Sequence, residues 1–162
     1  DLTKESLFNI ILHSNKFNVK IKDANILDMF SGVGSFGLEC LSREASTVTF
    51  VENYEKVLRI LKKNISNINC LEKSKILEKD AFNQLDLNNL GNKFDIIFMD
   101  PPYKEKLLPE LLKKILEAKI LYKEGVVVIH RHKNENDNLD KFFNIIEEKN
   151  YGISKIIFGK FF

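Results

Sequence analysis

A short apolar run that stops at two prolines constrains the fold of this chain more than any other feature. Phe94–Met99 is rich in β-branched and aromatic residues and lacks helical spacing, so it predicts a buried strand. Asp100-Pro101-Pro102-Tyr103 follows directly, and because proline has no N–H to donate to a sheet, the strand must end there. A carboxylate and an aromatic ring are therefore expected at the carboxyl end of a strand, where open α/β sheets bind ligands. The alternative is a plain loop with an exposed tyrosine.

A glycine-rich stretch upstream, Ser31–Gly37, favours the ligand-binding interpretation. It has the pattern G-x-G-x-x-G at Gly32, Gly34 and Gly37 and lies between a predicted strand and a predicted helix. Glycine is needed where the backbone takes a positive φ or approaches a ligand closely, and the first turn of the helix offers unpaired N–H groups. The pattern alone is weak evidence, but a strand before it and a helix and second strand after it are the correct context.

Two further predicted strands end in acidic residues. Glu52 ends the second strand, 20 residues beyond Gly32, where a carboxylate can accept hydrogen bonds from both ribose hydroxyls of an adenosine-containing cofactor. The alternative for Glu52 is an exposed surface side chain. Asp80 follows the third strand and is placed either to meet the adenine amino group or to cap a helix N-terminus.

The order of the predicted elements is that of an α/β protein with a mostly parallel sheet. Apolar runs predict the strands and amphipathic runs predict the helices. Gly125 marks the turn into the fifth strand, and the segments around Asn150–Gly152 predict a closing hairpin, although the first of them could be a helix. The predicted strands are 24–30, 47–51, 74–78, 94–99 and 126–129, and the predicted helices are 2–13, 38–43, 55–68 and 107–118. No linker divides the chain, so one domain is expected over residues 1–162.

The composition of the chain limits the kinds of protein to which it can belong. Apolar residues make up 44% and charged residues 30%, as in ordinary globular proteins, and a net charge of +2 does not by itself require a nucleic-acid partner. No apolar run is long enough to span a bilayer and no signal peptide opens the chain, so we expect a cytoplasmic protein without membrane association. Cys40 and Cys70 are expected to be free thiols, and the three histidines lack metal-ligand spacing, so no metal site is expected.

This set of motifs resembles the class I S-adenosylmethionine-dependent methyltransferases. Asp28 with the glycine pattern, Glu52 and Asp80 match the cofactor-binding positions of that family. Its members that methylate exocyclic or amide nitrogens carry Asp, Asn or Ser before two prolines and an aromatic residue, as at residues 100–103. Residues 5–11 and 27–43 and the late Tyr-Gly pair are very similar to the bacterial 16S ribosomal RNA guanine-N2 methyltransferases. The basic N-terminal segment of that family has no counterpart here, and His130 stands where the family often has Glu.

The resemblance implies a Rossmann-like fold with a mostly parallel seven-stranded sheet and a C-terminal antiparallel hairpin. It implies S-adenosyl-L-methionine as the cofactor and a monomer that acts on guanine N2 of 16S ribosomal RNA, either free or in an assembling small subunit. The cofactor-binding residues that it implies are Asp28, Phe30, Gly32, Gly34, Glu52, Asn53, Asp80, Ala81 and Asp100. The catalytic residues that it implies are Asp100, Pro101, Pro102 and Tyr103.

The chemistry of an exocyclic amine explains the tetrapeptide. The nitrogen lone pair is delocalised into the purine ring, so the amine is a poor nucleophile. The Asp100 carboxylate and the Pro101 carbonyl are expected to accept its two N–H bonds and to localise the lone pair, while Tyr103 stacks on the flipped base. Several basic residues follow strand ends on the same rim and are candidates for phosphate contacts, with plain solvated side chains as the alternative: Lys104, Lys106, Arg131, His132 and Lys133.

Two other functions remain open at this stage. A DNA adenine-N6 methyltransferase uses the same tetrapeptide, but 162 residues leave little room for a separate target-recognition region. A non-catalytic S-adenosylmethionine-binding scaffold would have no use for an intact Asp100–Tyr103 segment.

Overall fold

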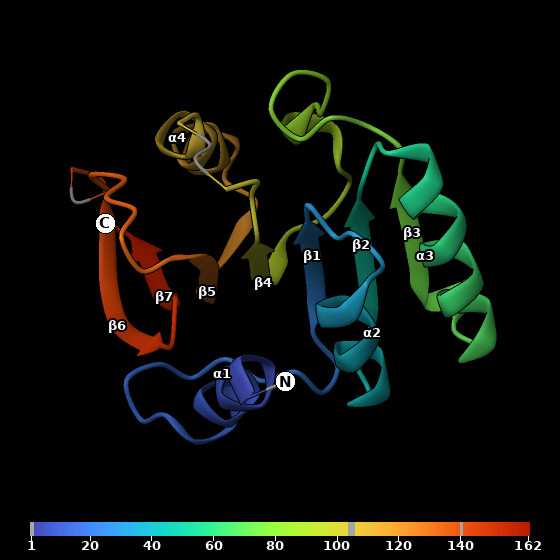
Figure 1. Cartoon of the computed structure of the whole chain (residues 1–162), viewed down its shortest axis with the longest axis horizontal. Coiled ribbons are helices and arrows are strands. Elements are labelled where there is room, and N and C mark those ends of the chain that lie inside the picture. Colours follow the sequence, from blue (N-terminus) through green and yellow to red (C-terminus); the bar gives the residue numbers. More distant parts are fainter. Residues whose placement is uncertain (1, 104–105, 140) are drawn as a thin grey trace.

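The computed structural model describes residues 2–103, 106–139 and 141–162 (Figure 1). Its strands form one seven-stranded sheet in the order β3-β2-β1-β4-β5-β7-β6. The strands are β1 (Asn25–Met29), β2 (Thr47–Val51), β3 (Ser74–Leu77), β4 (Phe94–Met99), β5 (Leu121–His132), β6 (Phe143–Tyr151) and β7 (Ser154–Phe161). The helices are α1 (Leu2–His13), α2 (Ser35–Ser42), α3 (Glu55–Asn67) and α4 (Leu108–Ala118), with short 3-10 turns η1 (Leu71–Lys73) and η2 (Leu87–Asn89).

The sheet has the predicted mixed character. The pairs from β3 to β5 are parallel, whereas β7 is antiparallel to both β5 and β6. The predicted α/β class and the C-terminal antiparallel hairpin are therefore confirmed. The helical alternative for the first tail segment was wrong, because Phe143 begins a strand that pairs with β7 along its length.

Helices cover both faces of the sheet, which is why its central strands are apolar nearly throughout. α1, α2 and α3 pack on one face, where Phe8, Phe50 and Leu61 are fully buried. α4 packs on the other face through Leu112 and Ile115. Figure 1 shows α1 and α4 on opposite sides of the sheet. No helix in the described ranges is long and apolar enough to cross a membrane.

Glycine shapes the turn from β1 into α2. Gly32 and Gly34 have φ of +57° and +93°, so the chain reverses quickly, and α2 begins at Ser35, three residues earlier than predicted. An added Cβ on Gly37 would lie 2.4 Å from the Phe50 ring. The third glycine of the pattern therefore lets α2 pack closely against β2.

The fifth strand begins earlier than the sequence predicts. β5 starts at Leu121 and passes through Gly125, so the prediction that this glycine precedes the strand was wrong. The pairing with β4 shifts register between Phe94 and Ile96, and a Cβ on Gly125 would lie 2.9 Å from the Asp95 carbonyl oxygen. Gly125 thus allows an irregularity inside the strand rather than a turn before it.

The parallel register brings the strand ends to one edge. Met29 of β1 lies opposite Val51 of β2 and Met99 of β4, and Met99 lies opposite Ile129 of β5. The residues that follow these positions are therefore neighbours along the carboxyl edge of the sheet: Phe30, Glu52, Asp100 and His130.

Candidate active site

Three cavities follow one another along the carboxyl edge of the sheet, and we refer to the three together as the cleft. The first, which we call the Glu52 cavity, has a volume of about 160 Å³. It is lined by Glu52, Asn53, Asp80 and Ala81 together with Phe30, all of which were predicted to bind the cofactor. The structure therefore brings together residues from three strand ends that are separate in the sequence.

The second cavity, which we call the Asp28 cavity, has a volume of about 190 Å³ and lies where α1 meets the ends of β1, β4 and β5. Phe30 lines both this cavity and the Glu52 cavity, so the two are adjacent. Phe30 itself has φ +57°, an uncommon conformation for a residue other than glycine. The polar residues that line the Asp28 cavity are Thr3, Lys4, Asp28, Ser31, Ser35, Asp100 and His130.

The third cavity, which we call the Tyr103 cavity, has a volume of about 180 Å³ and shares Asp100 and His130 with the Asp28 cavity. Its wall includes Tyr103, which is 63% exposed and meets the His132 ring edge-on with centroids 5.3 Å apart. Ile153, at the turn between β6 and β7, contributes an exposed apolar side chain. This end of the cleft offers aromatic and apolar surface to a flat ligand.

Asp28 makes the centre of the cleft favourable for a cation. Its Oδ2 accepts a hydrogen bond from the Gly37 N–H at 3.1 Å, whereas Oδ1 is buried and has no hydrogen-bond partner among the described residues. Burial raises the pKa of the Asp28 carboxyl from 3.8 to about 8; the Gly37 N–H opposes this rise, and the nearby Asp100 and Glu52 carboxylates add to it. A positively charged ligand group would lower this pKa, because it would satisfy Oδ1 and offset the repulsion that a charged Asp28 meets from Asp100 and Glu52.

The Glu52 carboxylate is held in place by backbone N–H groups. Oε1 accepts from Gly32 at 2.9 Å, and Oε2 accepts from Asn53 at 3.1 Å and from Tyr54 at 3.0 Å. The glycine loop and β2 are thus joined through one carboxylate, which also lines the Glu52 cavity. Such a held carboxylate suits the recognition of hydroxyl groups, because little side-chain entropy remains to be lost on binding.

Asp80 makes local hydrogen bonds and also lines the Glu52 cavity. Its Oδ1 accepts from the Phe82 N–H at 2.7 Å and the Asn83 N–H at 3.1 Å, so it caps the turn that follows β3. The alternative of a helix N-cap was wrong, because a turn and not a helix follows Asp80, but the carboxylate does accept backbone N–H bonds of that turn. Contact with an adenine group at the same position stays a prediction.

Gly32 and Gly34 shape the loop between β1 and α2 and do not line the three cavities of the cleft. A Cβ on Gly34 would lie 2.6 Å from Cδ1 of Leu61, so this glycine allows the loop to pack against α3. A Cβ on Gly32 would meet open space. Ser31 and Ser35, which flank the pair, line the Asp28 cavity instead.

The Arg131 side chain is hydrogen-bonded beside the two prolines, so it is not available to bind phosphate groups. Its guanidinium is buried, donates to both Asp137 oxygens at 3.0 and 2.9 Å, and donates to the Pro102 carbonyl at 3.4 Å. The prediction of a phosphate contact at Arg131 was therefore wrong. Lys106 is exposed with an ion pair to Glu135 at 3.7 Å, and Lys104 lies outside the described residues.

His130 and Ile153 are among the lining residues that the sequence did not identify as part of the site. His130 was given no role because the family often has Glu at its position, yet its Nδ1 lies 3.2 Å from Oδ1 of Asp100. Ile153 was seen only as part of a hairpin turn. A usable signal existed for His130, since the residue that follows one parallel strand should lie beside the residue that follows its neighbour.

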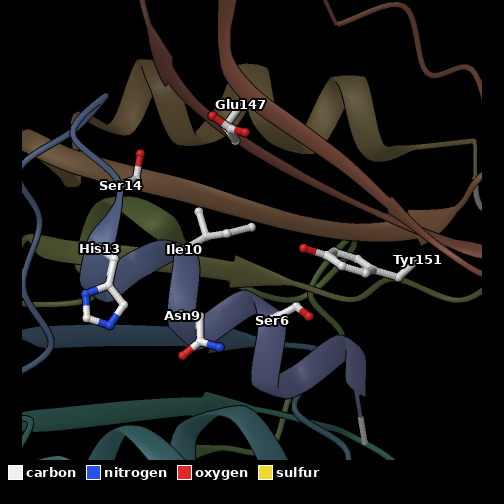
Figure 2. Close-up of a pocket in the computed structure, with 7 residues that line it drawn as sticks. All are labelled: Ser6, Asn9, Ile10, His13, Ser14, Glu147 and Tyr151. Carbon is white, nitrogen blue, oxygen red and sulfur yellow. The ribbon is translucent and has the colours of Figure 1, made fainter.

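A wider groove of about 680 Å³ lies away from these strand ends, between α1 and β6 (Figure 2). Ser6, Asn9 and His13 of α1 line one side, and Glu147 and Tyr151 of β6 line the other. None of the predicted site residues lies in this groove. The described residues include no cluster of His, Cys, Asp and Glu that could hold a metal ion.

Comparison with known proteins finds one matching family and several similar proteins. Residues 1–160 match the family described as conserved hypothetical protein 95. Ribosomal RNA small subunit methyltransferase D of Haemophilus influenzae is 29% identical over 154 residues, which cover 94% of this chain and 77% of that protein. The protein of the same name from Buchnera aphidicola is 30% identical over 158 residues, which cover 94% of this chain and 74% of that protein.

A solved structure agrees with these sequence relationships. The Escherichia coli methyltransferase candidate yhhF superposes with a TM-score of 0.84 and 26% sequence identity. The match covers 99% of this chain and 86% of that chain. The shared fold therefore extends over both halves of the sheet, including the hairpin.

Proposed function

This chain belongs to the conserved hypothetical protein 95 family, and from that membership and the shape of its cleft we propose that it is an S-adenosylmethionine-dependent methyltransferase of ribosomal RNA. The finer proposal is that it methylates the exocyclic N2 of a guanine in 16S ribosomal RNA, free or in an assembling small subunit. Such a substrate would be met in the cytoplasm.

The observation that carries the proposal is the position of Asp100 between two cavities. Asp100 lines the Asp28 cavity, which lies next to the Glu52 cavity at Phe30, and it also lines the Tyr103 cavity. A methyl donor on one side and an acceptor on the other would therefore meet at Asp100. Methyl transfer needs this arrangement, because the donor carbon and the attacking nitrogen must lie in line.

The residues on the donor side fit S-adenosylmethionine, which supplies a methyl group bound to a positively charged sulfur. Glu52 would accept hydrogen bonds from the ribose hydroxyls, and Asn53, Asp80 and Ala81 would surround the adenine. Asp28 carries a buried oxygen without a partner among the described residues, and a cationic group beside it would stabilise the charged form of this carboxyl.

The residues on the acceptor side fit a flat base. Tyr103 is exposed and would stack on a base that has left its helix, and His132 and Ile153 line the same cavity. The Asp100 carboxylate and the Pro101 carbonyl would accept the two N–H bonds of the amine. Arg131 supports this geometry by its hydrogen bond to the Pro102 carbonyl.

Transfer of radiolabelled methyl groups tests the proposal directly. The protein is incubated with labelled S-adenosylmethionine and, in parallel, undermethylated 30S particles, naked 16S ribosomal RNA and DNA. We expect label in the particles or the RNA, and digestion to nucleosides should yield N2-methylguanosine. Label in DNA alone would identify a DNA methyltransferase, and no label in any substrate would favour a non-catalytic scaffold.

Two variants show whether the labelling comes from this protein or from a contaminating methyltransferase. Asp100→Ala should abolish the labelling, since it removes the acceptor for the amine N–H. Glu55→Ala changes the same charge on the exposed side of α3, where Glu55 pairs only loosely with Arg59 at 3.3 Å. That variant should label the substrate as the unmodified protein does.

A further inference from the structure

His130 lies beside Asp100 because β4 and β5 are parallel neighbours in register. Met99 pairs with Ile129, so the two following residues project from the same edge of the sheet. The His130 Nδ1 lies 3.2 Å from the Asp100 Oδ1, within hydrogen-bond distance. His130 lines both the Asp28 cavity and the Tyr103 cavity, so its ring stands at the junction between the proposed donor and acceptor sides.

The other ring nitrogen of His130 is buried without a partner. Its Nε2 has no hydrogen bond within the described residues, and the only other buried side-chain atom of this kind there is Oδ1 of Asp28, which lines the same cavity. Buried polar atoms are nearly always paired, so two such atoms at one cavity point to a ligand that supplies both partners. A hydrogen bond from Nδ1–H to Asp100 leaves Nε2 with a free lone pair.

We propose that His130 accepts the proton that the substrate amine releases during methyl transfer, with Asp100 orienting its ring. This inference rests on the proposed function. As the amine nitrogen bonds to the methyl carbon, the carbon–sulfur bond breaks and its electron pair stays on sulfur. The nitrogen then carries a positive charge. It recovers neutrality when the N–H bond directed at the Pro101 carbonyl breaks and its proton moves to Nε2, since Pro101 and His130 line the same cavity and a carbonyl cannot keep the proton. The extra proton then leaves from the other ring nitrogen, because Nδ1 contacts the Asp100 carboxylate and the Asp100 side chain is 50% exposed to water.

The charged and titratable groups that face His130 come from several elements packed around it. Asp100 at the end of β4 contacts Nδ1, and Asp28 of β1 lines the same cavity. Lys4 of α1 also lines this cavity but lies 3.7 Å from Glu39, which offsets its charge. On β5, Arg131 is paired with Asp137 and His132 packs against Tyr103; on β7 the residue paired with His130 is the uncharged Ile156.

Single-turnover methyl transfer over a range of pH tests the inference. His130→Asn keeps an N–H donor near the Asp100 carboxylate but has no base, so we expect a rate about 100-fold lower. The rate of the unmodified protein should rise with pH as a general base becomes available, and the variant should lose that dependence. His13→Asn, a matched change in the groove between α1 and β6, should keep both the rate and the pH profile.

Two results would overturn the inference while leaving the proposed function intact. One is a His130→Asn rate within about threefold of the unmodified protein, and the other is an unchanged pH profile in that variant. Calorimetry with S-adenosylhomocysteine should give the same affinity for both proteins, which separates proton transfer from a disturbed donor site. If the unmodified protein labels no substrate at all, the proposed function fails first and this inference fails with it.

A measurement that does not depend on activity checks the pairing itself. Long-range ¹H–¹⁵N spectra of the unmodified protein should show neutral His130 with its proton on Nδ1. In Asp100→Asn the His130 ring signals should shift, because the carboxylate that orients the ring is gone. An Nε2-protonated neutral ring, or signals unaffected by the substitution, would contradict the proposed arrangement.

Discussion

Asp28 is the residue at which the needs of folding and of ligand binding conflict most clearly. A carboxyl group buried in the first strand costs free energy whenever it is charged, and only the Gly37 N–H compensates one of its oxygens. The same burial leaves Oδ1 free to meet a cationic ligand. A site that would bind a cation strongly therefore carries a stability penalty when no ligand is present.

This conflict predicts an unusual pH dependence of stability. The pKa of Asp28 is about 8 in the folded protein against 3.8 for the ordinary group, so between these values the folded state holds a proton that the unfolded state has lost. The contribution of Asp28 is thus fully present below about pH 4, falls as the pH rises, and levels off above pH 8. Urea unfolding between pH 5 and 9 should show this loss, and Asp28→Asn should flatten it. Equal slopes for both proteins would contradict the prediction.

The carboxylates of Glu52 and Asp100 should separate binding from turnover. Glu52→Ala removes the group expected to hold the ribose, so S-adenosylhomocysteine should bind about 10- to 100-fold more weakly, as expected for the loss of charge-assisted hydrogen bonds. Asp100→Ala should bind it nearly unchanged and yet transfer no methyl group. Isothermal calorimetry measures both affinities.

Because Glu52 also accepts three backbone N–H bonds, a second variant is needed. Glu52→Gln keeps one carbonyl oxygen for the Gly32 N–H and should disturb the loop less. A normal far-ultraviolet spectrum with weakened binding would support a direct ribose contact. Unchanged affinity in both Glu52 variants would refute that contact.

At the scale of elements, the end of β5 and the turn after it support the proline pair. Arg131 reaches from β5 to the Pro102 carbonyl and to both oxygens of Asp137, and its guanidinium also lies 3.6 Å from Glu135. These three acceptors belong to two different segments of the chain. A buried cation of this kind fixes the relative position of the segments more than it adds to stability.

Removal of this cation is expected to destabilise the protein substantially. Arg131→Met leaves the Asp137 carboxylate, which is 6% exposed, without its partner. We expect a loss of about 3–5 kcal/mol in the free energy of unfolding. The double variant Arg131→Met/Asp137→Leu should recover part of the loss, because no unpaired charge remains. Urea unfolding measures both, and equal stability of the single variant and the unmodified protein would show that the network does not hold the two segments.

At the scale of the whole molecule, the two edges of the sheet are protected against pairing with another copy. β3 has only four residues, and the outer strand β6 carries Glu147, Glu148 and Lys149 in its middle. Short edge strands and charged edge residues prevent edge-to-edge association. We therefore expect a monomer, and sedimentation equilibrium should give a mass near 18.8 kDa at all concentrations. A mass that rises with concentration would contradict this.

Much of the cleft was predictable because its residues follow strands that are evident locally. The apolar run Phe94–Met99 and the prolines after it determine where β4 ends, and this places Asp100 at the carboxyl edge. Glu52 follows from the same argument for β2, and the glycine pattern predicts the loop before α2. These features depend on short-range properties of the chain: alternation, turn chemistry and the missing N–H of proline.

The tertiary structure alone decided which strand ends become neighbours and which side chains are buried between them. His130 reaches Asp100 because β5 lies next to β4 in register, and Arg131 is buried because the following turn folds back over it. Neither relation can be read from local periodicity. His130 meets Asp100 across 30 residues and Arg131 meets the Pro102 carbonyl across 29 residues, and both contacts require β5 to be paired with β4. The sequence by itself thus determined the chemistry carried by each strand end, and the packing of the strands determined which of those groups act together.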